Sequence, residues 1–286
     1  MRVLILTGPT ASGKTALALE LAHQLNGEII NADSMQLYRH LPVLTACPTV
    51  QEKKEIPHHL YEILGDHDLS SAGWWVSQAV HYIDQLLERG RVPILVGGTG
   101  LYLRSLTSGI SPIPEIPSSI REEARRLAQA PSFHEIVFAF DPMVRGKLKE
   151  NDRQRLSRAW EVKMATGRSI IEWQQEKSQA LPYEFQKIAL VPARSWLHNR
   201  INARFDLMMS QGALEEVQAL KARPLRPDSP LLRAVGVKEL SDYLNGQTTL
   251  EQAIELAKIA TRQYAKRQLT WLRGQAQDYE VRHVGA

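Results

Sequence analysis

A glycine-rich loop near the N-terminus constrains the fold of this chain more than any other segment. Residues 8–15, GPTASGKT, are a full match to the phosphate-binding pattern G-x-x-x-x-G-K-[ST]. The loop follows an apolar run at residues 3–6 and precedes leucines at helical spacing, so we expect it between a strand and a helix. Its backbone N–H groups, the helix N-terminus and Lys14 can then bind a diphosphate, and the Thr15 hydroxyl can ligate Mg²⁺.

The phosphate-binding residues predicted from this motif are Gly8, Pro9, Thr10, Ala11, Ser12, Gly13, Lys14 and Thr15. The pattern does not identify the ligand, because ATP, GTP and other diphosphate esters present the same oxygens. A nucleotide or metabolite kinase therefore remains an alternative function. Such an enzyme would bind ATP at this loop and close a basic lid over it.

Apolar runs alternate with amphipathic segments along most of the chain. We expect strands at residues 28–32, 92–96 and 187–191, and helices at about 196–211, 213–222 and 250–272. This alternation predicts an α/β fold, a P-loop parallel sheet with helices on both faces. After residue 111, three closely spaced prolines are followed by mostly helical sequence. We therefore predict a core at 1–110 and 186–286 with an inserted helical subdomain at 111–185.

The composition is that of an ordinary folded protein, with 43% hydrophobic and 23% charged residues among 286. The one cysteine, Cys47, excludes an intramolecular disulfide and a cysteine-clustered zinc site. No apolar run approaches the roughly 20 residues needed to span a membrane, and the N-terminus lacks a signal-peptide pattern. We expect a cytoplasmic protein with no membrane segment.

The positive charge is concentrated in the C-terminal part of the chain. The net charge is 35 − 31 = +4, yet residues 143–168 alone carry eight basic and three acidic side chains. In this stretch Arg155 and Arg158 lie three residues apart beside Gln154, and residues 266–273 interleave cations with Trp271. Such segments bind a polyanion or form solvated helix faces, and Trp271 at helical spacing from Tyr264 is also consistent with a core position.

Two further motifs follow predicted strands, where the C-terminal ends of parallel strands meet at one crevice. Asp33 follows the second strand and could be a general base, or it could cap a helix with Gln36 at capping-box spacing. Residues 97–100, GGTG, follow the third strand and place Thr99 at the same crevice. Their glycines permit close approach to a ligand or simply a tight strand-to-helix turn.

Seven ordered motifs closely resemble the tRNA dimethylallyltransferase family: residues 8–15, 33–39, 57–60, 97–102, 151–155 with 158–162, 166–167, and 233–236. The resemblance implies transfer of a dimethylallyl group from dimethylallyl diphosphate to the exocyclic amine of the adenine 3′ of the anticodon. The substrates implied are tRNAs reading codons that start with U, and diphosphate is released. It also implies that the P-loop holds the prenyl donor rather than ATP, with Mg²⁺ on Thr15, in an enzyme expected to be monomeric.

The same resemblance implies roles for individual residues. Asp33 would be the base, and the other catalytic residues would be Lys14, Thr15, Thr99 and Arg204. The residues implied to bind the anticodon stem-loop of tRNA are Asp33, Ser34, Met35, Gln36, Thr99, Arg121, Gln154, Arg155, Leu156, Ser157, Arg158, Arg233, Ala234, Val235, Gly236, Val237, Lys238, Lys266, Arg267, Gln268, Leu269, Thr270, Trp271, Leu272 and Arg273. The target base must be extruded to reach the crevice.

The chain departs from the family pattern at a few positions. Leu44 and Cys47 stand where the family usually has glycine and lysine, in a Gly-Thr-Ala-Lys-Pro stretch, and Val237 replaces a common aromatic residue. The insertion before Asp141 is short. These departures are compatible with weaker tRNA affinity, altered tRNA choice or a divergent paralogue. A regulatory RNA-binding protein that has kept the fold and lost turnover is a second alternative function.

Overall fold

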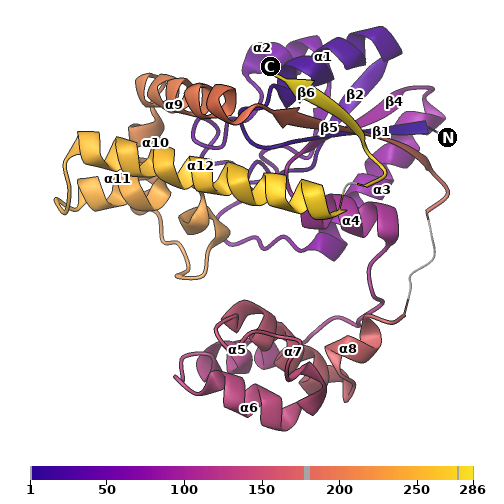
Figure 1. Ribbon diagram of the computed structural model, residues 1–286, viewed down its shortest axis with the longest axis vertical. Helices are drawn as coiled ribbons and strands as arrows, with labels where there is room; N and C mark the ends of the chain where they lie inside the picture. The colour runs from indigo at the N-terminus through magenta and orange to yellow at the C-terminus, as the bar shows by residue number, and fades with distance from the viewer. Residues whose placement is uncertain (1, 177–180, 276, 286) are drawn as a thin grey trace. The chain divides into compact units, whose positions relative to one another are not determined.

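The structure is a computed structural model that describes residues 2–176, 181–275 and 277–285 (Figure 1). The chain divides into two compact units, Met1–Thr107 with Pro182–Ala286 and Ser108–Leu181. The insertion predicted at 111–185 differs from the second unit by a few residues at each end. Among the described residues, no helix combines the length and the hydropathy that a membrane crossing requires.

The first unit is built on a six-stranded parallel sheet in the order β3-β2-β4-β1-β5-β6. Its strands are β1 (Arg2–Thr7), β2 (Gly27–Asn31), β3 (His58–His59), β4 (Val92–Gly97), β5 (Glu184–Pro192) and β6 (Glu280–Val284). The predicted fold class is confirmed. Residues 58–59 and 280–284 were not predicted as strands, because the first is very short and the second is a polar edge strand without apolar periodicity.

Helices cover both faces of this sheet (Figure 1). The helices of the unit are α1 (Lys14–Leu25), α2 (Val50–Glu55), α3 (Ala72–Glu88), α4 (Gly100–Ser108), α9 (Arg194–Ser210), α10 (Ala213–Lys221), α11 (Val237–Leu244) and α12 (Leu250–Gln275), with a 3-10 turn η2 at Pro230–Arg233. Alternate strand residues such as Leu4 and Ile94 pack on Ala18 and Ala22 of α1. On the opposite face, Ala189 of β5 packs against Leu272 of α12.

Four helices of the C-terminal half, α9 to α12, pack against one another. The start of α12 contacts α11, and its last turns reach the sheet beside the P-loop. A helix of 26 residues can connect these two regions because it rises about 1.5 Å per residue.

The second unit is helical and has its own apolar core. Its elements are α5 (Ser118–Leu127), α6 (Phe133–Phe140), a 3-10 turn η1 (Pro142–Val144), α7 (Arg153–Thr166) and α8 (Ile170–Trp173). Phe133, Leu156 and Trp160 are buried in this core. Asp152 caps α7 by accepting the N–H of Arg155 at 3.1 Å, and Gly167 ends the helix in the left-handed region.

Candidate active site

The P-loop joins β1 to α1, as the motif predicts. Gly13 precedes α1 with a φ of 93°, in the left-handed region that favours glycine. Lys14 is the first residue of α1, and its Nζ donates to the carbonyls of Gly8 (3.0 Å) and Pro9 (2.7 Å). The ammonium group is therefore held against the loop that a diphosphate would enter.

Two hydroxyl groups in the loop are placed to meet a ligand. The Ser12 hydroxyl is buried and has no hydrogen-bond partner among the described residues. A buried hydroxyl in this state costs free energy, and a phosphate oxygen bound in the loop would satisfy it. The Thr15 side chain is exposed in the first turn of α1.

Asp33 lies just after the end of β2, in a loop clamped by its neighbours. The Asn31 side chain donates from Nδ2 to the Asp33 carbonyl (2.9 Å) and accepts the Asp33 N–H at Oδ1 (2.8 Å). The Thr99 hydroxyl accepts the N–H of Ser34 at 2.9 Å. Thr99 thus positions the Asp33 loop through the backbone.

The capping-box interpretation of Asp33 is wrong, because no helix begins within residues 33–40, which form bends, turns and a single β-bridge. Asp33 Oδ1 does accept the Met35 N–H at 2.9 Å. The Gln36 side chain does not bond back to the Asp33 N–H, which donates to Asn31 instead; Gln36 Nε2 donates to the carbonyls of Thr45 (2.9 Å) and Ala46 (2.8 Å). Gln36 therefore connects the loop at residues 45–46 to the loop that contains Asp33.

Charges around Asp33 perturb one another. Burial raises the pKa of Asp33, while the Met35 N–H, Lys14 and Arg204 oppose this shift. Burial lowers the pKa of Lys14 to about 8, with Asp33 acting in the opposite direction. Burial also lowers the pKa of Arg204, whose Nη1 donates to the Thr10 hydroxyl at 3.4 Å. A carboxyl with a raised pKa beside two cations is typical of a functional site.

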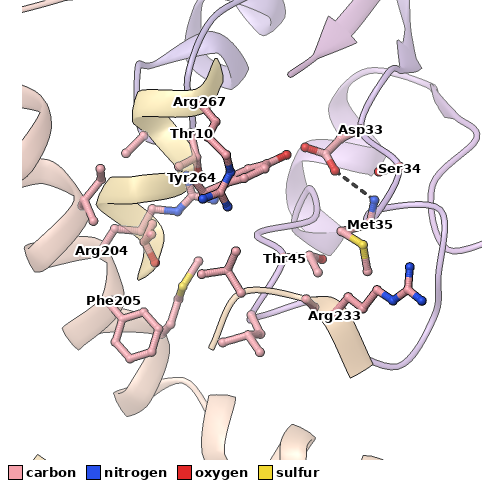
Figure 2. Close-up of a pocket in the computed structure, with 17 residues that line it drawn as sticks. Thr10, Asp33, Ser34, Met35, Thr45, Arg204, Phe205, Arg233, Tyr264 and Arg267 are labelled. Carbon is pink, nitrogen blue, oxygen red and sulfur yellow. Dashed lines mark hydrogen bonds between the residues drawn. The ribbon is translucent and has the colours of Figure 1, made fainter. Parts of the chain in front are cut away.

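A cavity of about 260 Å³ opens beside these groups, entirely within the first unit. Figure 2 shows Thr10, Asp33, Arg204, Tyr264 and Arg267 around one part of it. The remaining lining is largely apolar. It is contributed by Ala11, Met35, Leu44, Ile201, Phe205, Met208, Ala234 and Val235, together with Ser34, Thr45, Arg233 and Thr261. One cavity thus combines cations, a carboxylate and an apolar wall.

The end of α12 packs onto the P-loop and the GGTG turn. The Gln268 side chain accepts the Thr10 N–H at 2.8 Å and donates to the Gly98 carbonyl at 3.3 Å. A Cβ on Gly100 would lie 2.3 Å from the Trp271 ring. Gly98 and Gly100 therefore permit the close approach of α12, whereas Gly97 lies against the backbone of Ala32. Trp271 is partly buried and packs on the cluster of Ala189 and Leu272.

The structure places the remaining predicted tRNA-binding residues of the first unit in different environments. Arg233, Ala234, Val235 and Arg267 line the cavity. The side chains of Lys238, Lys266, Thr270 and Arg273 are exposed, Leu269 is partly buried, and Gly236, Val237 and Leu272 are buried. Lys238 pairs with Asp242 at 2.6 Å. RNA contacts by all of these residues stay predictions.

In the second unit, the predicted RNA-binding residues lie along α7 and on α5. Gln154 and Arg155 are exposed, Arg121, Ser157 and Arg158 are partly exposed, and Leu156 is buried in the core. Arg155 pairs with Asp152 at 3.4 Å and Arg158 with Glu161 at 3.3 Å. Both arginines are therefore partly neutralised within their own helix.

The loop that departs from the family pattern lines the cavity. Leu44 is 7% exposed and forms part of the apolar wall. Ala46 has a φ of 53°, in the left-handed region. Cys47 is partly buried, and burial raises the pKa of its thiol to about 12, so it is not a reactive thiolate.

Sequence reasoning missed three residues of this site. Asn31 holds the Asp33 loop, Glu216 binds the loop of residues 43–46, and Tyr264 lies in the cavity with its hydroxyl directed toward Asp33 (Figure 2). Only Tyr264 had a usable signal, since it lies three residues before Arg267 on the same helix face.

A parallel sheet whose first strand leads through this loop into a helix defines a P-loop α/β protein. The model of the IPP transferase family matches residues 36–275, and that of isopentenyl transferases matches residues 1–64. The chain belongs to the IPP transferase family, and the resemblance to tRNA dimethylallyltransferases is confirmed.

Relatives and solved structures agree with this assignment. The chain is 44% identical to a tRNA dimethylallyltransferase of Caulobacter sp. (strain K31), covering 98% of this chain and 92% of the relative. It is 46% identical to one of Parvibaculum lavamentivorans, over 96% and 88%. A tRNA isopentenylpyrophosphate transferase from Bacillus halodurans matches with a TM-score of 0.72 and 35% identity, covering 99% of this chain and 89% of that one. A eukaryotic dimethylallyltransferase described as acting on tRNA matches with a TM-score of 0.86 and 28% identity, over 99% and 73%.

Proposed function

We propose that this chain transfers a dimethylallyl group from dimethylallyl diphosphate to the exocyclic amine of the adenine 3′ of the anticodon. Its substrates are tRNAs that read codons starting with U, and diphosphate is the second product. Family membership and the named relatives support this activity. The observation that carries it is the single cavity shared by Thr10 of the P-loop, Asp33 and Arg204.

The cavity contains the groups that such a transfer needs. The adenine amine is a weak nucleophile, because its lone pair is delocalised into the ring. As the amine nitrogen bonds to the first carbon of the donor, Asp33 accepts a proton from it, and a raised pKa suits this role near neutral pH. The allylic C–O bond breaks with its electrons on the departing diphosphate, whose charge Lys14 and Arg204 stabilise.

The P-loop residues fit a diphosphate with Mg²⁺. Thr15 is exposed in the first turn of α1, and the buried Ser12 hydroxyl has no hydrogen-bond partner in the described part of the chain. Mg²⁺ commonly keeps several waters and binds through one protein oxygen together with phosphate oxygens of the substrate. Thr15 would hold the ion there, and the ion would supply positive charge to the leaving diphosphate.

Basic residues of both units would bind tRNA. Arg267 and Arg233 at the cavity and Arg155 on α7 would contact RNA phosphates and the extruded base. We further propose that the enzyme acts in the cytoplasm as a monomer.

The deciding experiment supplies the protein with Mg²⁺, total tRNA and dimethylallyl diphosphate radiolabelled in the prenyl group. We expect label in tRNA, recovered as prenylated adenosine after nuclease digestion. A parallel reaction with labelled ATP tests the kinase alternative. Absence of prenyl label from tRNA, with phosphoryl transfer from ATP, would refute the proposal.

A further inference from the structure

The cavity is polar on one side and apolar on the other. Thr10, Asp33 and Arg204 lie at the polar side, close to the P-loop (Figure 2). Leu44, Phe205 and Met208 belong to the apolar wall and are each less than 9% exposed. A prenyl diphosphate has the same division, because its phosphates are charged and its tail is a hydrocarbon. The tail of a donor bound with its phosphates at the P-loop would fit along the apolar wall.

Leu44 is held firmly in this wall by hydrogen bonds to its loop. The Glu216 carboxylate of α10 accepts the N–H of Val43 at 2.8 Å and that of Leu44 at 2.9 Å. From the other side, the Gln36 amide binds the carbonyls of Thr45 and Ala46. A loop fastened at both ends cannot easily swing its leucine out of the cavity.

The packing of Leu44 on its side away from the cavity also keeps its side chain from moving out of the cavity wall. Gly236 has a φ of 97°, and a Cβ there would lie 3.1 Å from Leu44 Cδ1 and 3.3 Å from Phe205 Cε2. The isobutyl group and the phenyl ring thus both pack against the backbone at Gly236. They form one rigid surface, and a longer tail would collide with it rather than displace it.

We propose that Leu44 limits the length of the prenyl donor, so that a five-carbon tail is accepted and a ten-carbon tail is excluded. This inference rests on the proposed function. It predicts that truncating Leu44 opens space next to Phe205 and Met208. The longer donor gains this space, whereas the shorter donor loses apolar contact with the wall.

The test measures initial rates of tRNA prenylation with dimethylallyl diphosphate and with geranyl diphosphate. Product is detected as prenylated adenosine by mass spectrometry. For Leu44→Ala, we expect the ratio of kcat/KM for geranyl to dimethylallyl diphosphate to rise about tenfold or more over wild type. The volume-conserving Leu44→Met and the control Leu207→Ala, at a leucine of α9 that is 54% exposed, should leave the ratio nearly unchanged.

A second variant covers the case in which Leu44→Ala does not fold. Leu44→Phe should reduce the affinity for dimethylallyl diphosphate and leave the affinity for inorganic diphosphate unchanged, because only the tail meets the wall. If wild type prenylates tRNA but neither variant alters donor preference or affinity in this way, Leu44 does not limit donor length. If wild type prenylates no tRNA, the proposed function is wrong, and the inference about Leu44 is then wrong as well.

Discussion

Asn31 and Asp33 are joined by a reciprocal pair of hydrogen bonds, in which one buried amide side chain binds both the N–H and the carbonyl of Asp33. The same amide also donates to the Leu60 carbonyl at 2.9 Å. Asn31 thereby holds the Asp33 backbone at the end of β2, while the Asp33 carboxylate accepts the Met35 N–H and is directed at the cavity (Figure 2).

Replacing Asn31 should therefore misplace the base. We expect Asn31→Ala to lower kcat at least about tenfold while the dissociation constant for dimethylallyl diphosphate changes little, because the P-loop is not touched. It should also destabilise the fold by about 1–3 kcal/mol, since it leaves buried backbone groups unpaired. Single-turnover rates, donor titration and thermal unfolding check these effects. An equal loss of rate and of donor affinity would contradict the positioning role.

Asp33→Ala should abolish most turnover while both substrates still bind. Loss of a general base typically costs about 10²–10⁴-fold in rate. In wild type, protonation of Asp33 should reduce the rate as the pH falls, and burial moves this loss to a higher pH than for an exposed aspartate. Asp33→Asn keeps the shape of the side chain and serves as the control. A single-turnover rate within about tenfold of wild type would show that another group accepts the proton.

Donor binding should weaken above about pH 8, because the pKa of Lys14 in the free protein is lowered to about 8. Below this pH the ammonium is charged and attracts the diphosphate. Above it, binding must also take up a proton, so the dissociation constant should rise by up to about tenfold per pH unit. Titrations of dimethylallyl diphosphate between pH 7 and 9.5 measure this. Lys14→Arg stays charged and should show no such rise; a flat wild-type profile would disprove the assignment.

Glu216→Ala should loosen the loop of residues 43–46. The N–H groups of Val43 and Leu44 lose their acceptor, so we expect a loss of about 1–3 kcal/mol in stability and a higher KM for dimethylallyl diphosphate. Glu216→Gln keeps one acceptor oxygen and should be intermediate. Glu215→Ala, at the exposed neighbouring position, is the matched control. Steady-state kinetics and thermal melts would refute the role if Glu216→Ala behaved like Glu215→Ala.

Charge reversal on α7 tests its assignment to RNA. We expect Arg155→Glu with Arg158→Glu to weaken tRNA binding and to reduce the slope of log affinity against log salt by roughly one to two. Affinity for dimethylallyl diphosphate should not change. The control reverses two charges elsewhere, Lys54→Glu with Lys221→Glu. Should the α7 variant and the control give the same tRNA affinity and salt slope, the α7 arginines face solvent.

The sequence by itself determined the parts of this protein that depend on neighbouring residues. The P-loop could be predicted from residues 8–15, because its glycines, its lysine and the following helix act within a few residues of one another. The main strands and the helices of the C-terminal half followed from apolar periodicity in the same way. The three closely spaced prolines after residue 111, followed by mostly helical sequence, similarly indicated a separate unit.

The tertiary structure alone decided which distant residues complete the site. Gln268 bonds to Thr10 across 258 positions, and Glu216 bonds to Val43 across 173, so neither contact leaves a local pattern. The sequence allowed Asp33 to be a helix cap or a base, and only the structure showed that no helix begins there and that the Gln36 side chain binds the loop at Thr45. The physical reason is that a side chain's partner depends on which segments the sheet and helices bring together, whereas a sequence pattern describes only its own segment.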